Sequence, residues 1–177
     1  MNYDAEPPRR AAMSPRRRDT QPHPDIAMYR PDVSDHGSTE AFQKVAARLA
    51  GRIIELANTG DDDARADGIR EIFATDYTLH SRTGDVMGCD AYIERIAANL
   101  RTFSGMHFIM DDLVVQGDRF ALRYHWTAPH GDGEIGNEAL EINRVVNGQV
   151  VETWNYQDLL SLMTKLGVID NPLAPSA

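Results

Sequence analysis

The stretch from Glu138 to Gly167 constrains the fold of this chain more than any other part of the sequence. Its central dipeptide, Asn147-Gly148, suits a two-residue type I′ turn, because both residues of such a turn adopt positive φ. Apolar residues such as Leu140, Ile142, Val150 and Val151 flank this dipeptide on both sides. The stretch is therefore predicted to form a β-hairpin.

The second strand of this hairpin has one face that mixes aromatic and acidic side chains. Alternate residues of a strand share a face, so this mixed face consists of Glu152, Trp154, Tyr156 and Asp158. A two-residue turn would place Glu141 opposite Trp154, and it would place Asn143 opposite Glu152. Solvated faces rarely hold such aromatic residues, and apolar cores rarely hold carboxylates. This face is predicted to form the wall of a pocket.

Length and composition are those of a single globular domain with a possible tail. The chain has 177 residues, of which 42% are hydrophobic and 25% are charged. Its net charge of −9 argues against nucleic-acid and anionic-membrane partners. Its apolar runs are too short for a transmembrane helix, and its arginine-rich start lacks a signal-peptide core. One cysteine, Cys89, excludes an intrachain disulfide and a Cys-rich metal site. We expect a cytoplasmic protein.

Residues 1–37 differ in composition from the rest of the chain. They hold six of the nine prolines and few large apolar residues, so they are predicted to be a disordered arm. Six arginines balance six acids there, and the whole charge of −9 therefore lies in the rest of the chain. Two alternatives stay open: an arm that wraps a partner subunit, or a true start at Met13 or Met28.

The remaining residues, 38–172, are predicted to form one α+β domain, followed by a tail at 173–177. Helical periodicity predicts three helices, at 38–58 with Ser38 as cap, at 62–73 and at 90–102. Short strands are expected at 77–80, 107–115 and 119–127, followed by a loop at 128–137, the hairpin, and a closing helix at 159–166. Helices first and antiparallel strands afterwards indicate helices packed on one face of a curved sheet.

The order of these elements and the motif GQVVETWNYQDLLSLMTKLG resemble the SnoaL-like polyketide cyclases of the NTF2-like superfamily. The family pattern is a strand ending in Arg144-Val145, a turn with Gly148, an apolar-apolar-Glu-x-Trp run ending at Trp154, and Asp158. The resemblance covers about residues 40–172. It implies a cone of about three N-terminal helices on a strongly curved, mostly antiparallel sheet.

In these cyclases, the residue matching Asp158 is the acid/base of an intramolecular aldol ring closure. An Asp on the floor of an apolar cavity is disfavoured as an anion, so its pKa rises toward a useful range. Trp154 and Tyr156 would form apolar walls, with Glu141 and Asn143 as further pocket residues. Such chemistry requires no metal and no cofactor. The alternative is that Asp158 only caps the closing helix.

The limonene epoxide hydrolases share this cone and provide a second resemblance. Their Arg-x-Asp strand motif falls on Arg123-Tyr124-His125, so His125 replaces one of their two carboxylates, and His80 replaces an Asn. The same mapping would bring His80, Arg123 and His125 into the cavity with Asp158. His125 and Arg123 would then stabilise charge on oxygen, and His80 would orient the substrate. Alternatively, Arg123 and His125 lie on an outer, subunit-facing surface of the sheet.

Together these features predict a cofactor-independent cyclase or isomerase that acts on a hydrophobic, polycyclic carbonyl compound. An epoxide hydrolase with a modified charge set is the alternative enzyme. A small-ligand-binding or dimerisation module on the same scaffold is the alternative without catalysis. The family resemblance also implies a homodimer.

Overall fold

A computed structural model describes residues 39–170 of the chain. The predicted arm at 1–37, the predicted helix cap Ser38 and the predicted tail at 173–177 lie outside the described residues. No helix within the described range combines the length and the apolar character that crossing a membrane would require.

Four helices form in this part of the chain, close to the predicted positions. They are α1 (Glu40–Asn58), α2 (Asp62–Ile72), α3 (Cys89–Thr102) and α4 (Leu159–Lys165). Thr39 is the cap of α1, because its hydroxyl oxygen accepts a hydrogen bond from the Phe42 N–H at 3.2 Å. Asp61 caps α2 in the same way through the Ala64 N–H.

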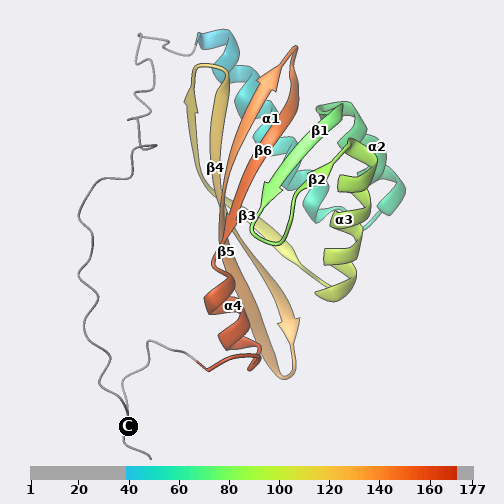
Figure 1. The fold of residues 1–177 in the computed structure, drawn as a ribbon, viewed down its shortest axis with the longest axis vertical. Helices are drawn as coiled ribbons and strands as arrows, with labels where there is room; N and C mark the ends of the chain where they lie inside the picture. The colour runs from blue at the N-terminus through green and yellow to red at the C-terminus, as the bar shows by residue number, and fades with distance from the viewer. Residues whose placement is uncertain (1–38, 171–177) are drawn as a thin grey trace, which may run out of the picture. The chain divides into compact units, whose positions relative to one another are not determined.

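Six strands of residues 39–170 form one mixed sheet, whose spatial order is β2-β1-β6-β5-β4-β3 (Figure 1). Their bounds are β1 (Phe73–Ser81), β2 (Val86–Met87), β3 (His107–Gln116), β4 (Arg119–His130), β5 (Gly133–Val146) and β6 (Gln149–Gln157). The pair β1 and β6 is parallel, and all other neighbours are antiparallel. The short strand β2 is not predicted from the sequence.

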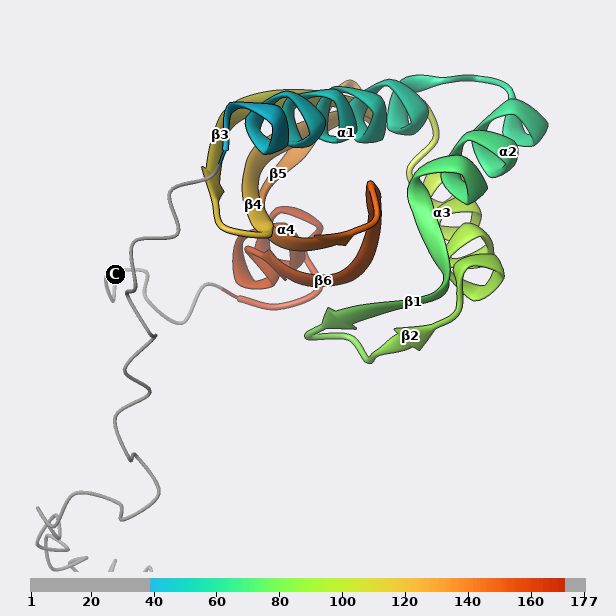
Figure 2. The same ribbon diagram turned by 90° about the horizontal axis from the view of Figure 1, so that it is seen from above.

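The sheet curves strongly, and the three N-terminal helices lie on its inner side. Seen from above, α1 runs along β3, β4 and β5, while α2 and α3 lie beside β1 (Figure 2). The inner face of β4 contributes Phe120, Leu122, Tyr124 and Trp126 to the buried core, as its alternation predicts. This arrangement confirms the predicted α+β cone.

The β4–β5 hairpin is longer than the sequence suggests, so the predicted loop at 128–137 is wrong. β4 continues to His130, and β5 begins at Gly133. Ala128 and Ile135 are paired and buried, so they continue the inward-facing alternation of both strands. The glycines and acids of this segment occupy the turn and the outward positions. Its composition therefore resembles a loop although its backbone is extended.

The β5–β6 hairpin has the predicted two-residue turn. Asn147 and Gly148 adopt φ of 51° and 79°, and Val146 pairs with Gln149 directly beside them. Positive φ is accessible to both residue types, which is why this dipeptide favours the type I′ turn.

Past the turn, β6 contains one extra residue. Val145 pairs with Val150, but Arg144 pairs with Glu152, so Val151 forms a β-bulge. A slip of one residue moves every later side chain to the other face.

The predicted pairing of Glu141 with Trp154 and of Asn143 with Glu152 is therefore wrong. Glu141 pairs with Asn155, and Asn143 pairs with Thr153. Asn143 and Thr153 are fully buried, and the Thr153 hydroxyl donates to Asn143 Oδ1 at 2.6 Å. The inner face of this hairpin thus carries amides, a hydroxyl and a carboxylate in place of the predicted aromatic residues.

Gly136 in β5 leaves room for the backbone of β4. A Cβ added there would lie 2.7 Å from the Trp126 carbonyl oxygen, and backbone cannot move away cheaply. We expect Gly136→Ala to lower the free energy of unfolding by about 1–3 kcal/mol in urea titrations. Gly51→Ala is the control, because Gly51 is an exposed glycine in α1 with open space around it. It should stabilise the protein by about 0.5–1 kcal/mol. Equal effects of both substitutions would contradict the described packing.

Candidate functional site

An apolar cavity of about 320 Å³ lies between the helices and the inner face of the sheet. Its lining comes from all four helices and from five of the six strands. The apolar members of the lining include Ile53, Leu56, Ile69, Phe73, Leu79, Tyr92, Ile96, Leu100, Phe103, Phe108, Trp126, Leu162 and Met163. A largely apolar cavity of this size, with a few polar groups that converge in it, is typical of a small-molecule site.

Three polar side chains from neighbouring strands meet at the wall of this cavity: Tyr124 of β4, Glu141 of β5 and Asn155 of β6. The Tyr124 hydroxyl donates to Glu141 Oε1 at 3.0 Å, and Asn155 Nδ2 donates to the same oxygen at 2.8 Å. Asn155 Nδ2 also lies 3.3 Å from the Tyr124 oxygen. We call these three residues the Glu141 cluster.

Burial raises the pKa of Glu141 above its ordinary value of 4.5. Hydrogen bonds from Asn155 and Tyr124 oppose this rise, and so does the nearby amide of Asn143. The Asn143 amide nitrogen itself makes no hydrogen bond of good geometry within residues 39–170. No cation within residues 39–170 contributes to the pKa of Glu141. The carboxyl is therefore a stronger base than a solvated glutamate.

The Tyr124 hydroxyl is held in its protonated form. Its side chain is buried, and burial together with the negative charge of Glu141 raises its pKa well above 10. A phenol in this environment donates a hydrogen bond and keeps its proton across the physiological pH range.

Asp158 lies outside the cavity lining and caps α4. Its carboxylate accepts a hydrogen bond from the Ser161 N–H at 3.0 Å, and the side chain is exposed. This is the alternative that the sequence left open. Asp158 therefore does not lie on the floor of the apolar cavity, where the resemblance placed it. An acid/base role of Asp158 stays a prediction.

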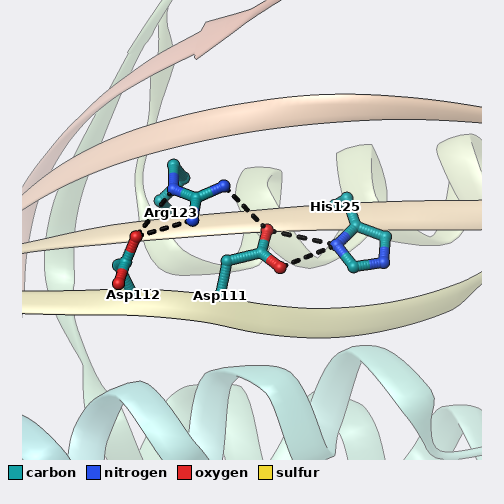
Figure 3. Close-up of polar contacts among 4 residues, drawn as sticks. All are labelled: Asp111, Asp112, Arg123 and His125. Carbon is teal, nitrogen blue, oxygen red and sulfur yellow. Dashed lines mark hydrogen bonds and ion pairs between the residues drawn. The ribbon is translucent and has the colours of Figure 1, made fainter.

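Arg123 and His125 lie on the outer face of the sheet, where Figure 3 shows them with two acids of β3. Arg123 donates to Asp112 through Nε at 2.9 Å and through Nη2 at 2.6 Å. His125 Nδ1 lies 3.0 Å from Asp111. A bulge at Asp111 in β3 lets both acids reach β4.

The predicted hydrogen bond between His125 and Asp158 is not formed, because Asp111 is the acid that contacts the His125 ring. His125 and Asp158 border a second, open hollow together with Lys165. This hollow is separate from the cavity that holds the Glu141 cluster. The predicted meeting of His80, Arg123, His125 and Asp158 in one apolar cavity is therefore wrong.

His80 and Trp154 also contact each other outside the cavity lining. Their rings stack at 5.4 Å between centroids, and the Arg119 guanidinium lies 5.2 Å from the Trp154 ring. His80 Nε2 lies 3.0 Å from Glu152, and Nδ1 lies 3.1 Å from Asp85. Tyr156 is half exposed on the same strand as Trp154. The bulge at Val151 turns both aromatic residues of β6 away from the cavity.

Of the eight residues that the sequence suggested for the site, Glu141 lines the cavity and Asn143 lies beside it on the same face of β5. Sequence reasoning missed Tyr124 and Asn155. One signal was available: Thr153, Asn155 and Gln157 are polar residues at alternate positions of β6, so they share one face of that strand. Within residues 39–170, no group of three or more His, Cys, Asp or Glu side chains is arranged to hold a metal ion.

The sequence matches the family model of the SnoaL-like polyketide cyclases over residues 47–166. This match covers more than half of the chain, so the protein belongs to the SnoaL-like polyketide cyclase family. A search of curated proteins found no significant match.

Solved structures with the same fold include three informative relatives. A candidate SnoaL-like polyketide cyclase from Jannaschia sp. CCS1 is 19% identical, with a TM-score of 0.58, over 68% of this chain and 92% of that chain. A candidate polyketide cyclase from Bacillus cereus ATCC 10987 is 25% identical, with a TM-score of 0.62, over 71% of this chain and 82% of that chain. A candidate isomerase of the SnoaL-like family from Agrobacterium tumefaciens C58 is 14% identical, with a TM-score of 0.58, over 65% of this chain and 98% of that chain. These similarities support the cone fold.

Glu141 should make stability fall as the pH rises. A carboxyl with a raised folded-state pKa binds its proton in the folded protein after the unfolded chain has released it. The native state is therefore penalised as the pH rises from about 4.5 through the raised pKa of Glu141. We expect Glu141→Gln to be more stable than the parent above this window, with the advantage vanishing below pH 4.5. Urea unfolding at several pH values measures this difference, and a difference that does not change with pH would contradict the buried carboxyl.

His80 should act in the opposite direction. Hydrogen bonds that the His80 ring donates to Glu152 and Asp85 raise its pKa above 6.5, so they stabilise the folded state fully below pH 6.5. This stabilisation is lost as the pH rises through the raised pKa. The His80 contact lowers the pKa of Glu152, so protonation of Glu152 weakens the pair again below about pH 4.5. We expect His80→Gln to reduce the melting temperature most between pH 4.5 and 6.5 and least in alkaline buffer. A loss that grows with pH would contradict this ion pair.

Proposed function

We propose that this protein is a cofactor-independent cyclase or isomerase that moves a proton on a hydrophobic carbonyl compound, with Glu141 as the proton carrier. The observation that carries this proposal is the carboxyl of raised pKa at the wall of an apolar cavity. Family membership supports the choice of cyclisation or isomerisation as the type of reaction. The apolar lining supports a ring-containing substrate.

The reaction starts with the Glu141 carboxylate, which removes a proton from the carbon next to a substrate carbonyl. The C–H electron pair becomes an enolate. In a ring closure, the enolate carbon attacks a second carbonyl carbon of the same molecule and forms a C–C bond. The resulting alkoxide oxygen then takes the proton back from Glu141. The product is an isomer of the substrate, so the step requires no further reactant.

Tyr124 and Asn155 support this cycle as hydrogen-bond donors. Both donate to Glu141 Oε1, so Oε2 is the carboxylate oxygen that we assign to the substrate proton. Their donation fixes the carboxylate plane relative to the cavity. When Glu141 takes up a proton, its neutral carboxyl accepts weaker hydrogen bonds from these donors. The Tyr124 hydroxyl then becomes available to donate to the developing oxyanion.

The two candidate carboxylates can be compared with a matched pair of substitutions. Glu141→Gln and Asp158→Asn each replace one carboxylate by its amide. Asn is as good an N-cap as Asp, so Asp158→Asn keeps α4 capped. The probe is an anthraquinone with a β-keto ester side chain. In D₂O, mass spectrometry measures deuterium uptake at the acidic carbon of the probe. In H₂O, liquid chromatography separates the cyclised product from the probe, because the two isomers have the same mass.

We expect Glu141→Gln to lower the enzymatic rate by about 10²–10⁴-fold, the usual contribution of one general acid/base. Asp158→Asn should retain the parent rate, and circular dichroism should show both variants folded. A folded Asp158→Asn variant without activity, beside an active Glu141→Gln variant, would transfer the role to Asp158. A parent protein that binds the probe but exchanges no proton above the buffer background would favour the binding-module alternative.

A further inference from the structure

The most exposed residues of the cavity lining lie together at one end of the cavity. Among the residues that line it, those with exposed side chains are Arg82 and Thr83, in the turn after β1, and Asn99 of α3. Arg95 of α3 also lines the cavity, is partly buried, and donates a hydrogen bond to the Thr83 hydroxyl. The opening therefore lies between this turn and α3, and two guanidinium groups border it.

Neither of these arginines is neutralised by an acid of the described chain. Most arginines of residues 39–170 form ion pairs, and these are Arg52, Arg65, Arg70, Arg119, Arg123 and Arg144. Arg65 also lines the cavity, but Asp62 neutralises it. Within the described range, Arg82 and Arg95 line the cavity without such a partner. This opening therefore carries two uncompensated cations, although acids outnumber bases in the whole chain.

Glu141 does not serve as their partner either. Its pKa responds to burial and to three neutral side chains, and no arginine contributes to it. The cavity therefore has a cationic opening, apolar walls and a separate carboxyl cluster. A ligand that matches this order has an apolar ring system with an anionic group at one end.

We propose that Arg82 and Arg95 bind a carboxylate of the substrate at the opening, while its ring system fills the cavity. Guanidinium groups present several N–H donors in a plane that matches a carboxylate. An anchor at the opening fixes which carbon of the rings reaches Glu141. This inference rests on the proposed function, since it assumes that the substrate occupies the cavity, and it narrows the substrate class to carboxylic acids.

The two tryptophans allow a direct binding assay in the full-length protein. Trp126 lines the cavity, whereas Trp154 contacts His80 outside the cavity lining. Since the chain has two tryptophans, Trp154→Phe leaves Trp126 as the sole fluorescent reporter. The probes are anthraquinone-2-carboxylate and its methyl ester, which share one ring system and differ in charge. Quenching of Trp126 gives the dissociation constant of each probe.

We expect the carboxylate to bind about 10- to 100-fold more tightly than the ester, as charged hydrogen bonds predict. Arg95→Gln should remove this preference and leave ester binding unchanged. Arg82→Gln, at an exposed turn position, provides a second variant if Arg95→Gln does not fold. Arg101→Gln is the matched control, because Arg101 lies in the last turn of the same helix, exposed and outside the cavity lining. It should change neither constant.

Three outcomes would overturn the inference, and they distinguish its failure from that of the proposed function. If acid and ester bind equally, or if Arg101→Gln has the same effect as Arg95→Gln, the cavity remains a ligand site but the carboxylate anchor is wrong. If neither probe quenches Trp126, the cavity does not take up aromatic carbonyl compounds. In that case the substrate class in the proposed function is wrong as well.

Discussion

The extra residue at Val151 decides which side chains of β6 face the cavity. Without this bulge, the two-residue turn at Asn147-Gly148 would place Trp154 opposite Glu141. With it, Asn155 takes that place and donates a hydrogen bond to the Glu141 carboxyl. A change of one residue in register reverses the two faces of a strand. The polar wall of the cavity and the aromatic outer face of β6 therefore both depend on the β-bulge at Val151.

The Glu141 cluster joins three neighbouring strands around one carboxyl. Burial of a carboxyl is costly unless hydrogen bonds compensate it, and here Tyr124 and Asn155 provide them. The compensation is partial, because the pKa of Glu141 still lies above its ordinary value. An apolar residue at this position would avoid that cost. Glu141 therefore lowers the stability of the domain, and it lies in a cavity large enough for a ligand. Both features are consistent with the proposed chemistry.

The fold could be predicted from local patterns, whereas of the site only Glu141 and its neighbour Asn143 could. Helical spacing in α1 and the Asn147-Gly148 turn are local signals, and the structure confirms both. The bulge at Val151 arises from pairing between strands and leaves no clear mark in the sequence of β6. For this reason the alternation of Trp154 and Tyr156 indicated the wrong face. The acid that contacts His125 was missed for a related reason, since the bulge at Asp111 also depends on strand pairing.

The proposed chemistry depends on a Glu141 carboxyl whose proton affinity is raised by its place at the cavity wall. An NMR titration of the ¹³C-labelled glutamate side-chain carboxyls measures this property in the intact protein. Comparison with the Glu141→Gln spectrum identifies the resonance of Glu141. We expect a midpoint above the ordinary value of 4.5 and a further rise when an apolar ligand fills the cavity. A midpoint at or below 4.5 would contradict it, because it would mean that the carboxyl is solvated or paired with a cation.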